Sequence, residues 1–372
     1  MSLTRALAVA ALRPRPPRGA LSPAALDGVR RLLVVRAHDQ LGDFLLAGPA
    51  LAALRRRFAA ARITLVVNRF LAPLARHHPD ADRVLVAPWG RGAGAAGGAA
   101  GFWAALRDEP YDLAVVLNTV SHSLSSDATA RLAGARVVAG PAAPPLKDTP
   151  GAPLYDWAYD PAPPAGPHEM DRALAAVAPL GGPGAPLAYR FALTPAERAA
   201  AERLRATLSA GRLVALHVGT KDPAKRYPTA LWIAAADAVA ARLGAHVALL
   251  DAPDARAAGA ELARGLRAAH TPLPPLTLRE TAAFLTHAEL LLCHDSALLH
   301  LAAAVGVPTV SVHGRGDAAR WKPPGARHVA LQAPDCVPAS VPPEQVAAAA
   351  LAAVAAGAGA TAGPPPAAGS AP

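Results

Sequence analysis

Two successive series of apolar, strand-like runs constrain the fold of this chain more than any other feature. The first series covers residues 32–35, 63–67, 84–87, 113–117 and 137–139. The second covers residues 213–216, 247–250, 290–293, 307–312 and 329–331, with helical patterns near 195–209, 229–242, 254–268, 278–287 and 297–305. Uninterrupted apolar runs suit strands buried on both faces, and their alternation with helices is typical of parallel sheets. We therefore expect an α/β protein with two facing Rossmann-like domains and a cleft between them.

Stretches rich in proline and glycine separate the two series. Residues 159–167 read YDPAPPAGP, a helix is expected at 169–180, and residues 181–186 again favour irregular structure. The pattern predicts five segments along the chain. These are a flexible basic N-terminal segment (1–28), an N-terminal Rossmann-like domain (29–165), a linker region with a helix (166–186), a C-terminal Rossmann-like domain (187–345), and a C-terminal helix end with a disordered tail (346–372).

Composition excludes several classes of protein. No apolar run approaches the roughly 18 to 20 residues that span a bilayer, and the arginine-rich N-terminus carries no secretion signal. The formal charge of +10 favours anionic partners, but neither interleaved aromatic residues nor a reading helix indicates nucleic acid. Cys293 and Cys336 are too few for a disulfide scaffold and lack the spacing of a zinc site. We therefore expect a cytoplasmic protein.

Asp43 follows the first strand run, at a turn that contains Gly42. Apolar residues recur at helical spacing after this turn, which puts Asp43 in the first turn of a helix. The partial positive charge of a helix start favours a carboxylate there, and Gly42 leaves open space beside it. A single aspartate in this place is more often only a helix cap. However, the carboxyl edge of a parallel sheet is also where ligands bind, so Asp43 is a candidate site residue.

A basic segment leaves the first strand of the second series. Residues 217–228 read HVGTKDPAKRYP and lead into a helix at Pro228. They combine a flexible turn, the hydroxyl of Thr220 and the cations Lys225 and Arg226, which together suit a phosphate group. The alternative is a solvated basic loop.

A third segment, residues 290–310, reads as strand, polar turn, short apolar helix and strand. Asp295 or Ser296 is expected to cap the helix, and the free N–H groups at such a helix start can hold a diphosphate. His300 lies one turn into the helix and faces the same loop. The alternative for His300 is a histidine packed in the core.

Several literal motif matches do not fit their context. Residues 92–97 spell G-x-G-x-x-G within a low-complexity stretch, and Asp112 opens the following strand, where a ribose-binding acid closes it. Asp80-Ala81-Asp82 follows a proline and suits a turn. His77 and His78 are adjacent and cannot aim at one metal from a helix. There is no Walker A sequence and no nucleophile elbow. We expect no metal site.

Taken together and in this order, the segments resemble glycosyltransferase family 9, the heptosyltransferases of lipopolysaccharide assembly. The likeness covers about residues 31–320. It rests on GDFLLAGPALAALR (42–55), HPDADRVL (78–85), YDLAVVLN (111–118), HEMDRALAAVAPLG (168–181), HVGTKDPAKRYP (217–228) and LTLRETAAFLTHAELLLCHDSALLHLAAAVGVPTVSVHG (276–314).

The resemblance implies a GT-B fold and an inverting, metal-independent transfer without a cofactor, from a nucleotide-diphosphate heptose such as ADP-heptose. It makes Asp43 the general base and Lys225 the ligand of the donor phosphates. The family's donor loop falls on Asp295, Ser296 and Ala297, with His300 behind them, and Leu276 falls where the backbone meets the nucleobase. Two departures stand out: Ala297 replaces the usual glycine, and residues 251–257 offer Asp254 in place of a ribose-binding glutamate.

The resulting hypothesis is a cytoplasmic sugar transferase that acts on a lipopolysaccharide-type or other lipid-linked glycan. Its basic N-terminal region would lie near the anionic inner face of the inner membrane. Two alternatives stay open. One is a nucleotide-sugar epimerase on a similar fold, which forms product without an acceptor. The other is a non-catalytic nucleotide-sugar binding protein, which binds the donor but releases no nucleotide diphosphate.

Overall fold

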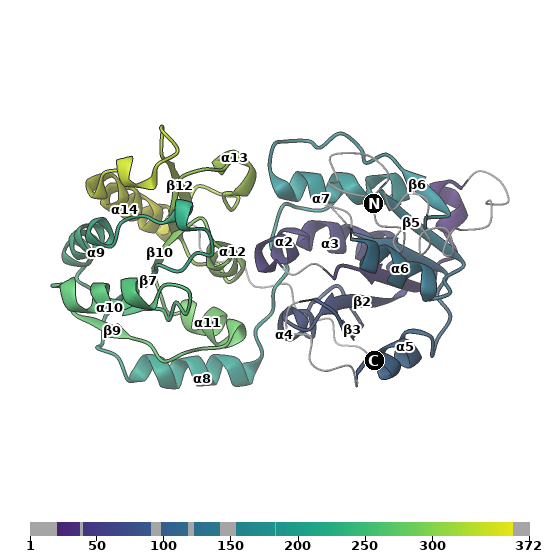
Figure 1. Ribbon diagram of the computed structural model, residues 1–372, viewed down its shortest axis with the longest axis horizontal. Coiled ribbons are helices and arrows are strands. Elements are labelled where there is room, and N and C mark those ends of the chain that lie inside the picture. Colours follow the sequence, from purple (N-terminus) through teal and green to yellow (C-terminus); the bar gives the residue numbers. More distant parts are fainter. Residues whose placement is uncertain are drawn as a thin grey trace. The chain divides into compact units, whose positions relative to one another are not determined.

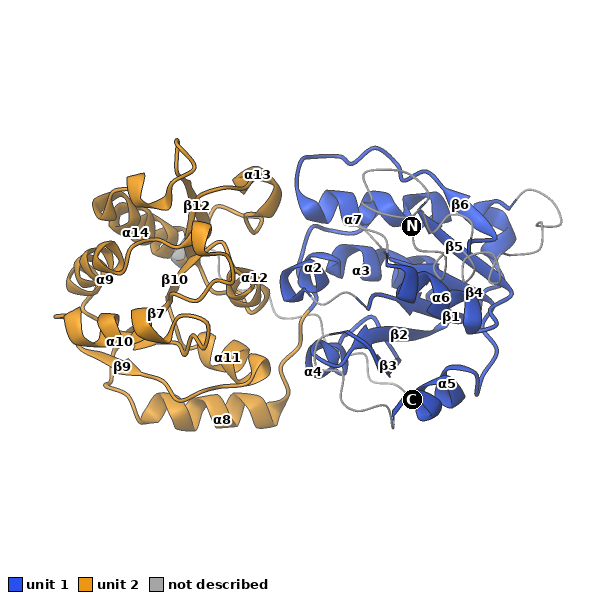
Figure 2. Cartoon of the chain, viewed as in Figure 1, with its two compact units in different colours: residues 1–190 blue, residues 191–372 orange. Residues whose placement is uncertain are grey.

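The computed structural model describes residues 21–37, 40–90, 98–117, 123–141, 154–182 and 184–359. The chain divides into two compact units, residues 1–190 and 191–372 (Figure 2). Each unit contains a six-stranded, fully parallel sheet flanked by helices (Figure 1), which confirms the predicted α/β class with two Rossmann-like units. The glycine-rich match at 92–97, most of the N-terminal segment and the tail from residue 360 lie outside the described residues.

Unit 1 has the strand order β3-β2-β1-β4-β5-β6. Its strands are β1 (Arg31–Val35), β2 (Arg62–Asn68), β3 (Arg83–Ala87), β4 (Leu113–Val116), β5 (Val137–Pro141) and β6 (Trp157–Tyr159). Its helices are η1 (Pro23–Leu26), α2 (Leu41–Leu46), α3 (Gly48–Arg57), α4 (Ala72–Ala75), α5 (Ala99–Leu106), α6 (Leu124–Leu132), α7 (Glu169–Val177) and η4 (Ala178–Leu180). The helix expected in the linker region, α7, packs against α3 within unit 1.

Unit 2 has the equivalent strand order β12-β11-β10-β7-β8-β9. Its strands are β7 (Arg212–His217), β8 (Ala245–Leu249), β9 (His270–Pro272), β10 (Leu290–His294), β11 (Thr309–His313) and β12 (His328–Gln332). Its helices are α8 (Pro195–Ala206), η5 (Pro223–Lys225), α9 (Thr229–Leu243), α10 (Arg256–Gly265), α11 (Leu278–Leu285), α12 (Ala297–Ala304), α13 (Ala318–Trp321), η6 (Pro338–Ser340) and α14 (Pro343–Gly359).

The strand orders locate a switch point in each sheet. In unit 1 the chain runs outward from β1 through β2 to β3, then returns to add β4 on the other side of β1. In unit 2 it does the same around β7, so that β10 lies beside β7 on the side away from β8. Loops that leave adjacent strands in opposite directions open a crevice at the carboxyl ends of those strands. The candidate sites are therefore expected after β1 and β4, and after β7 and β10.

Alternation along the central strands builds a core on each face of the sheet. In β7, Val214 and Leu216 pack with the α9 residue Trp232, whereas Leu213 and Ala215 pack on the other face with the α11 residue Phe284. Successive strand residues point to opposite faces, so an apolar run with no polar interruption supplies both cores. This is why the strand runs were visible in the sequence.

The helix expected after the turn at Gly42 is divided into α2 and α3 at Ala47. Pro49 explains the break, because it lies in the first turn of α3 and cannot donate a backbone hydrogen bond to the preceding turn. A proline is tolerated in a first turn but not in a helix interior. The break leaves Asp43 on a separate six-residue helix.

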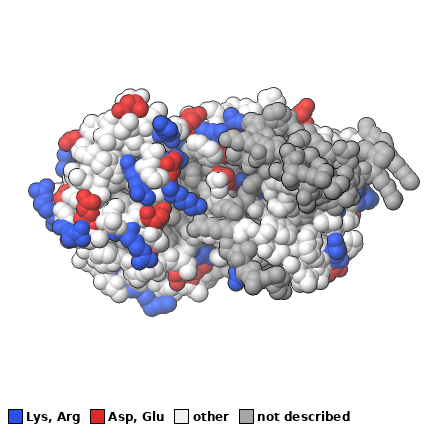
Figure 3. All heavy atoms as spheres, in the orientation of Figure 1, with Lys and Arg blue, Asp and Glu red and all other residues white. Residues whose placement is uncertain are grey.

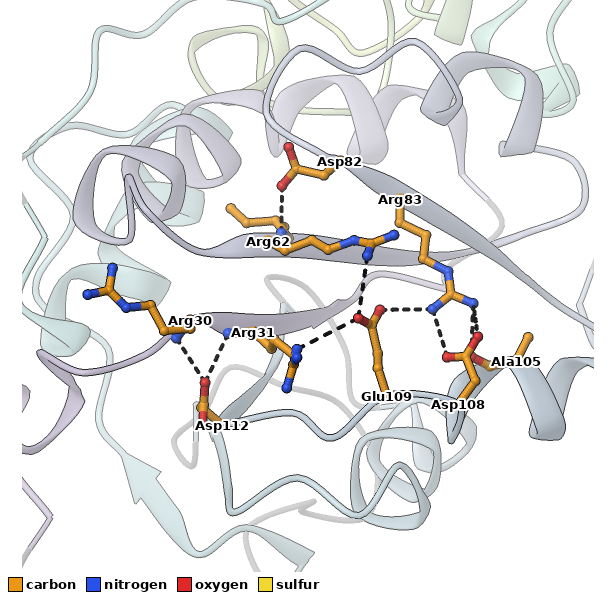
Figure 4. Close-up of polar contacts among 10 residues, drawn as sticks. Arg30, Arg31, Arg62, Asp82, Arg83, Ala105, Asp108, Glu109 and Asp112 are labelled. Carbon is orange, nitrogen blue, oxygen red and sulfur yellow. Dashed lines mark hydrogen bonds and ion pairs between the residues drawn. The ribbon is translucent and has the colours of Figure 1, made fainter. Parts of the chain in front are cut away.

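The amino edge of the first sheet is held by a network of ion pairs and hydrogen bonds (Figure 4). The Asp112 carboxylate accepts hydrogen bonds from the backbone N–H groups of Arg30 and Arg31, which lead into β1. Arg83 donates to Asp108 and Glu109 at 2.8–2.9 Å. Asp112 thus lies at the start of β4 and binds backbone groups at the amino edge of the sheet, whereas a ribose-binding acid ends its strand.

Both aspartates of the Asp80-Ala81-Asp82 sequence form hydrogen bonds within unit 1. Asp80 is buried and accepts two hydrogen bonds from Arg190 at 2.8 and 2.9 Å, at the end of unit 1. Asp82 accepts from Arg55 and from the backbone of Ile63. Carboxylates engaged in this way are structural, which agrees with the interpretation of this segment as a turn.

Candidate functional site

Asp43 lies in the first turn of α2, directly after the switch point of the first sheet. Its side chain is half-buried. The helix start was predicted, and it is the place where a carboxylate is electrostatically favoured. Residues 38 and 39 of the preceding turn lie outside the described residues. Among the described ones, α2 contacts α7, and Asp43 is joined to Arg36, which follows β1.

A buried arginine ties these elements to Asp43. Arg36 follows β1, is 2% exposed, and donates to the carbonyl oxygens of Leu117 at 3.0 Å and of Asp43 at 3.1 Å. Burial lowers the pKa of Arg36, and the carboxylates of Asp43 and Glu169 act in the opposite direction. A buried guanidinium requires such counter-charges. Arg36 therefore joins the ends of β1 and β4 to α2 and places one cation near two acids.

In unit 2 the two predicted segments meet at the switch point. The lysine loop, which we define as residues 217–228, carries Lys225 at the end of η5, and Asp295 follows β10. Lys225 Nζ and Asp295 Oδ2 form an ion pair at 2.5 Å. The turn is stabilised by Asp222, whose carboxylate accepts from the backbone of Ala224. Two site residues predicted from separate segments of the sequence are thus in direct contact.

The remaining predicted residues belong to the same unit, and their surroundings differ. Thr220 is buried, and Arg226 is exposed and donates to the carbonyl oxygen of Asp254 at 3.2 Å. Ala297 is the first residue of α12, and His300 is buried within that helix. Leu276, just before α11, packs against the core on one face of the sheet.

Ser296 occupies the N-cap position of α12, but its side chain makes no capping hydrogen bond. One of the two expected residues, Ser296, therefore does occupy the N-cap position, but the expected hydrogen bond from the helix backbone to its side chain is absent. Among the described residues, the Ser296 Oγ is a buried atom with no hydrogen-bond partner. Buried polar atoms are almost always paired, so an unpaired one beside a helix start is suited to a ligand.

Three histidines at strand ends were not predicted as site residues. Each of the adjacent strands β7, β10 and β11 ends in a buried histidine, at positions 217, 294 and 313. In the part of the chain that the structure describes, the Nδ1 atom of each has no hydrogen-bond partner. The sequence did hold a signal, because the apolar runs LVALH, LLLCH and TVSVH all end in histidine. Its meaning depends on the adjacency of these strands in the sheet.

Burial controls the charge of these histidines. It lowers the pKa of His217 to about 4. It also lowers the pKa of His313, against the attraction of the Asp295 carboxylate and together with the repulsion of the Lys225 ammonium group. The three histidines are therefore neutral hydrogen-bonding groups near neutral pH.

Gly219 allows the lysine loop to pack closely against its surroundings. A Cβ atom at this position would lie 2.6 Å from the Asp254 Oδ1 and 2.8 Å from the His217 ring. Only glycine avoids both contacts without a shift of the loop. The two segments that follow β7 and β8 are thus in contact at Asp254, close to the Lys225 site.

Charge elsewhere on unit 2 is mixed. On the face shown in Figure 3, Lys and Arg side chains of unit 2 are interspersed with Asp and Glu. Over the described ranges, no three or more His, Cys, Asp or Glu residues are grouped so that they could hold a metal ion. No helix in the same ranges is long and apolar enough to cross a membrane.

Solved structures with the same fold cover nearly the whole chain. A glycosyl transferase family 9 structure from Veillonella parvula DSM 2008 is 19% identical, with a TM-score of 0.76 over 89% of this chain and 98% of that one. The E. coli heptosyltransferase WaaC with ADP is 23% identical, with a TM-score of 0.67 over 85% and 97%. The E. coli ADP-heptose lps heptosyltransferase II is 18% identical, with a TM-score of 0.69 over 88% and 98%.

No curated protein sequence matches this chain. The family model for glycosyltransferase family 9 (heptosyltransferase) matches residues 100–341, which include the lysine loop, Asp295 and the helix start at Ser296. That match spans well over half of the chain, and the fold of the similar structures agrees with it. The protein is a glycosyltransferase that belongs to family 9, the heptosyltransferase family.

Proposed function

We propose that the protein transfers a heptose from ADP-heptose to a hydroxyl group of a lipopolysaccharide-type or other glycan acceptor, with inversion at the anomeric carbon and without a metal ion. The observation that carries this proposal is the Lys225–Asp295 ion pair at the switch point of unit 2, beside the unpaired Ser296 Oγ and the start of α12. For a diphosphate, Lys225 supplies a cation, the start of α12 supplies backbone N–H groups, and Ser296 supplies a hydroxyl. The E. coli enzyme WaaC has been solved with ADP and with ADP-2-deoxy-2-fluoro heptose, which supports the choice of donor.

The chemistry assigns separate tasks to the two sets of residues. As the sugar leaves, negative charge grows on the nucleoside diphosphate, and Lys225, Arg226 and the α12 N–H groups stabilise it. An acceptor hydroxyl is a weak nucleophile, so Asp43 takes its proton as the new glycosidic bond forms. Because the charge on the leaving group is met by protein cations, the proposal requires no metal ion.

The proposal also specifies where the protein works. We propose that it is cytoplasmic and acts at the inner face of the inner membrane, on an acceptor anchored there. The formal charge of +10 favours contact with anionic headgroups. The acceptor contacts are proposed to come from the segments of unit 1 near residues 88–101 and 141–155, parts of which lie outside the described residues.

A donor screen tests the proposal directly. The full chain is mixed with ADP-heptose, UDP-sugars or GDP-sugars, and release of nucleoside diphosphate is followed with and without a glycan acceptor, in buffer with and without EDTA. We expect acceptor-dependent ADP release from ADP-heptose that EDTA does not change. The configuration of the new bond is read from the NMR coupling of the product.

The same screen separates the alternatives. Conversion of a UDP-sugar without any acceptor would indicate an epimerase. Binding of the donor with no release of diphosphate under any condition would indicate a non-catalytic binding protein. Loss of activity in EDTA, restored by a divalent cation, would contradict the metal-independent transfer.

Replacing Lys225 by Ala tests the phosphate site. Charge-assisted hydrogen bonds contribute about 1.5 to 3 kcal/mol, so we expect kcat/KM for the donor to fall by about 10- to 150-fold. Lys221 belongs to the same loop and is exposed, so Lys221→Ala is the matched control and should retain near-normal kcat/KM. Equal losses in the two variants would mean that the loop acts only through its net charge.

A further inference from the structure

The lysine loop is attached to β10 through a histidine that the donor does not need to contact. The Nε2 atom of His294 accepts a hydrogen bond from the backbone N–H of Tyr227 at 2.8 Å and another from the Trp232 indole N–H at 3.1 Å. Two donors directed at one ring nitrogen require a neutral imidazole with its proton on Nδ1. His294 is 1% exposed, so these bonds are shielded from water.

The end of the loop is restrained by further contacts around this histidine. The Tyr227 hydroxyl donates to the carbonyl oxygen of Val341 at 2.8 Å. The Tyr227 and Trp232 rings meet edge to face with centroids 4.9 Å apart, and Trp232 meets His294 in the same way at 5.4 Å. Tyr227 is therefore fixed at its backbone and at its hydroxyl, two residues after Lys225.

The last residue of β10 and the residue after it thus each hold a different part of the lysine loop. Asp295 holds the Lys225 ammonium group, and His294 holds the backbone at Tyr227. A donor diphosphate competes with Asp295 for the ammonium group, because both are anions. The bond to His294 involves no charge and no atom that the phosphate contacts, so it persists when the donor binds.

We propose that His294 is a positioning residue that keeps the lysine loop in place while Lys225 exchanges Asp295 for the donor diphosphate. This inference rests on the proposed donor site and adds a residue that does not contact the donor. The low pKa of His294, about 4 and mainly due to burial, is consistent with a group that stays neutral throughout the cycle.

The test compares three variants of the full chain. His294→Phe removes the acceptor and keeps a ring, with His294→Leu as a substitute where Phe does not fold, and His294→Gln keeps an acceptor oxygen. Val239→Ala is the stability control, because Val239 is fully buried in α9 and is not part of the lysine loop. Thermal unfolding of every variant shows how much stability each change costs.

Two measurements are made on each variant. The first is ADP affinity by calorimetry, which we expect to fall about tenfold in His294→Phe, because the loop loses the hydrogen bond that holds its backbone at Tyr227, and to change by less than about threefold in His294→Gln and Val239→Ala. The second is the rate of native-state tryptic cleavage after Lys225 or Arg226, which we expect to rise only in His294→Phe.

The two measurements also separate this inference from the proposed function. Wild-type protein that binds no ADP would contradict the proposed donor, and the cleavage rates would still decide whether His294 holds the loop. Cleavage in His294→Phe at the wild-type rate would overturn the positioning role. The same holds for a loss of ADP affinity in Val239→Ala equal to that in His294→Phe, because the effect would then follow stability alone.

Discussion

Replacing Asp43 by Asn is expected to lower kcat for sugar transfer by about 10³-fold and to leave ADP affinity unchanged. General base catalysis contributes about 10²- to 10⁴-fold, and an amide cannot take the proton of the acceptor hydroxyl. The change is nearly isosteric, and the bond from Arg36 goes to the backbone carbonyl of Asp43, so the first turn of α2 is retained. Steady-state kinetics with saturating donor and acceptor measure the effect.

The control for this variant is Asp160→Asn, because Asp160 is an exposed aspartate of the same unit. We expect it to have normal kcat. Asp43→Asn also removes one of the two carboxylates near the buried Arg36, so its thermal unfolding is measured as well. A variant that folds normally and retains kcat within about tenfold of wild type would remove Asp43 from the role of base.

The regular elements were predictable where burial imposes a pattern. β1, β7 and β10 are buried on both faces, so their central residues must be apolar without interruption, and the sequence shows this. β6 and β9 have three residues each and were not predicted. Three residues at the edge of a sheet need no distinctive composition, because their pairing depends on the neighbouring strand rather than on their own side chains.

The candidate site was predictable for a different reason. Lys225 and Asp295 were identified because each lies in a polar turn between a strand and a helix, which is a local pattern. That they touch follows from the adjacency of β7 and β10, which no local pattern shows. The contact thus needed the sheet order as well as the motifs.

Arg36 and the strand-end histidines were missed because each is a single residue at the end of an apolar run. A lone arginine or histidine there has many structural explanations. Arg36 acquires its meaning when its guanidinium is seen to join Leu117 and Asp43, which lie 81 and 7 residues away in the chain. The functional roles of the site residues remain predictions. These residues are Asp43, Thr220, Lys225, Arg226, Leu276, Asp295, Ser296, Ala297 and His300.

The protein is also expected to lose stability on mild acidification, between about pH 6.5 and pH 4. Burial lowers the pKa of His78, His217 and His294 to about 4 and that of His328 to about 3, from an ordinary value of 6.5. Hydrogen bonds support this in two cases, since His78 and His294 accept backbone N–H groups on a ring nitrogen. In this range the unfolded chain binds protons that the folded chain does not, so stability is complete above pH 6.5 and falls as the pH drops.

Each such histidine contributes a slope of up to about 1.4 kcal/mol per pH unit, so several together can remove a large part of the roughly 5 to 15 kcal/mol that stabilises a typical domain. The effect is separable from that of the carboxylates. The Arg279 hydrogen bond lowers the pKa of Glu197 to about 2, so its contribution disappears only below about pH 4.5. Urea unfolding at pH 7.5, 6.5, 5.5 and 4.5 should therefore show a free energy of unfolding that is nearly constant down to about pH 6.5 and falls below that pH.

Two variants decide whether the buried histidines cause this fall. His294→Gln keeps the acceptor for Tyr227 but cannot be protonated. The number of protons taken up on unfolding below pH 6.5, which sets the slope of the free energy of unfolding against pH, should therefore decrease by up to about one. His77→Asn is the matched control, because the His77 side chain is exposed to water. A free energy of unfolding that stays constant from pH 7.5 to pH 5 would contradict the prediction. It would mean that these histidines are protonated within the folded protein, which is incompatible with the two hydrogen bonds that His294 Nε2 accepts.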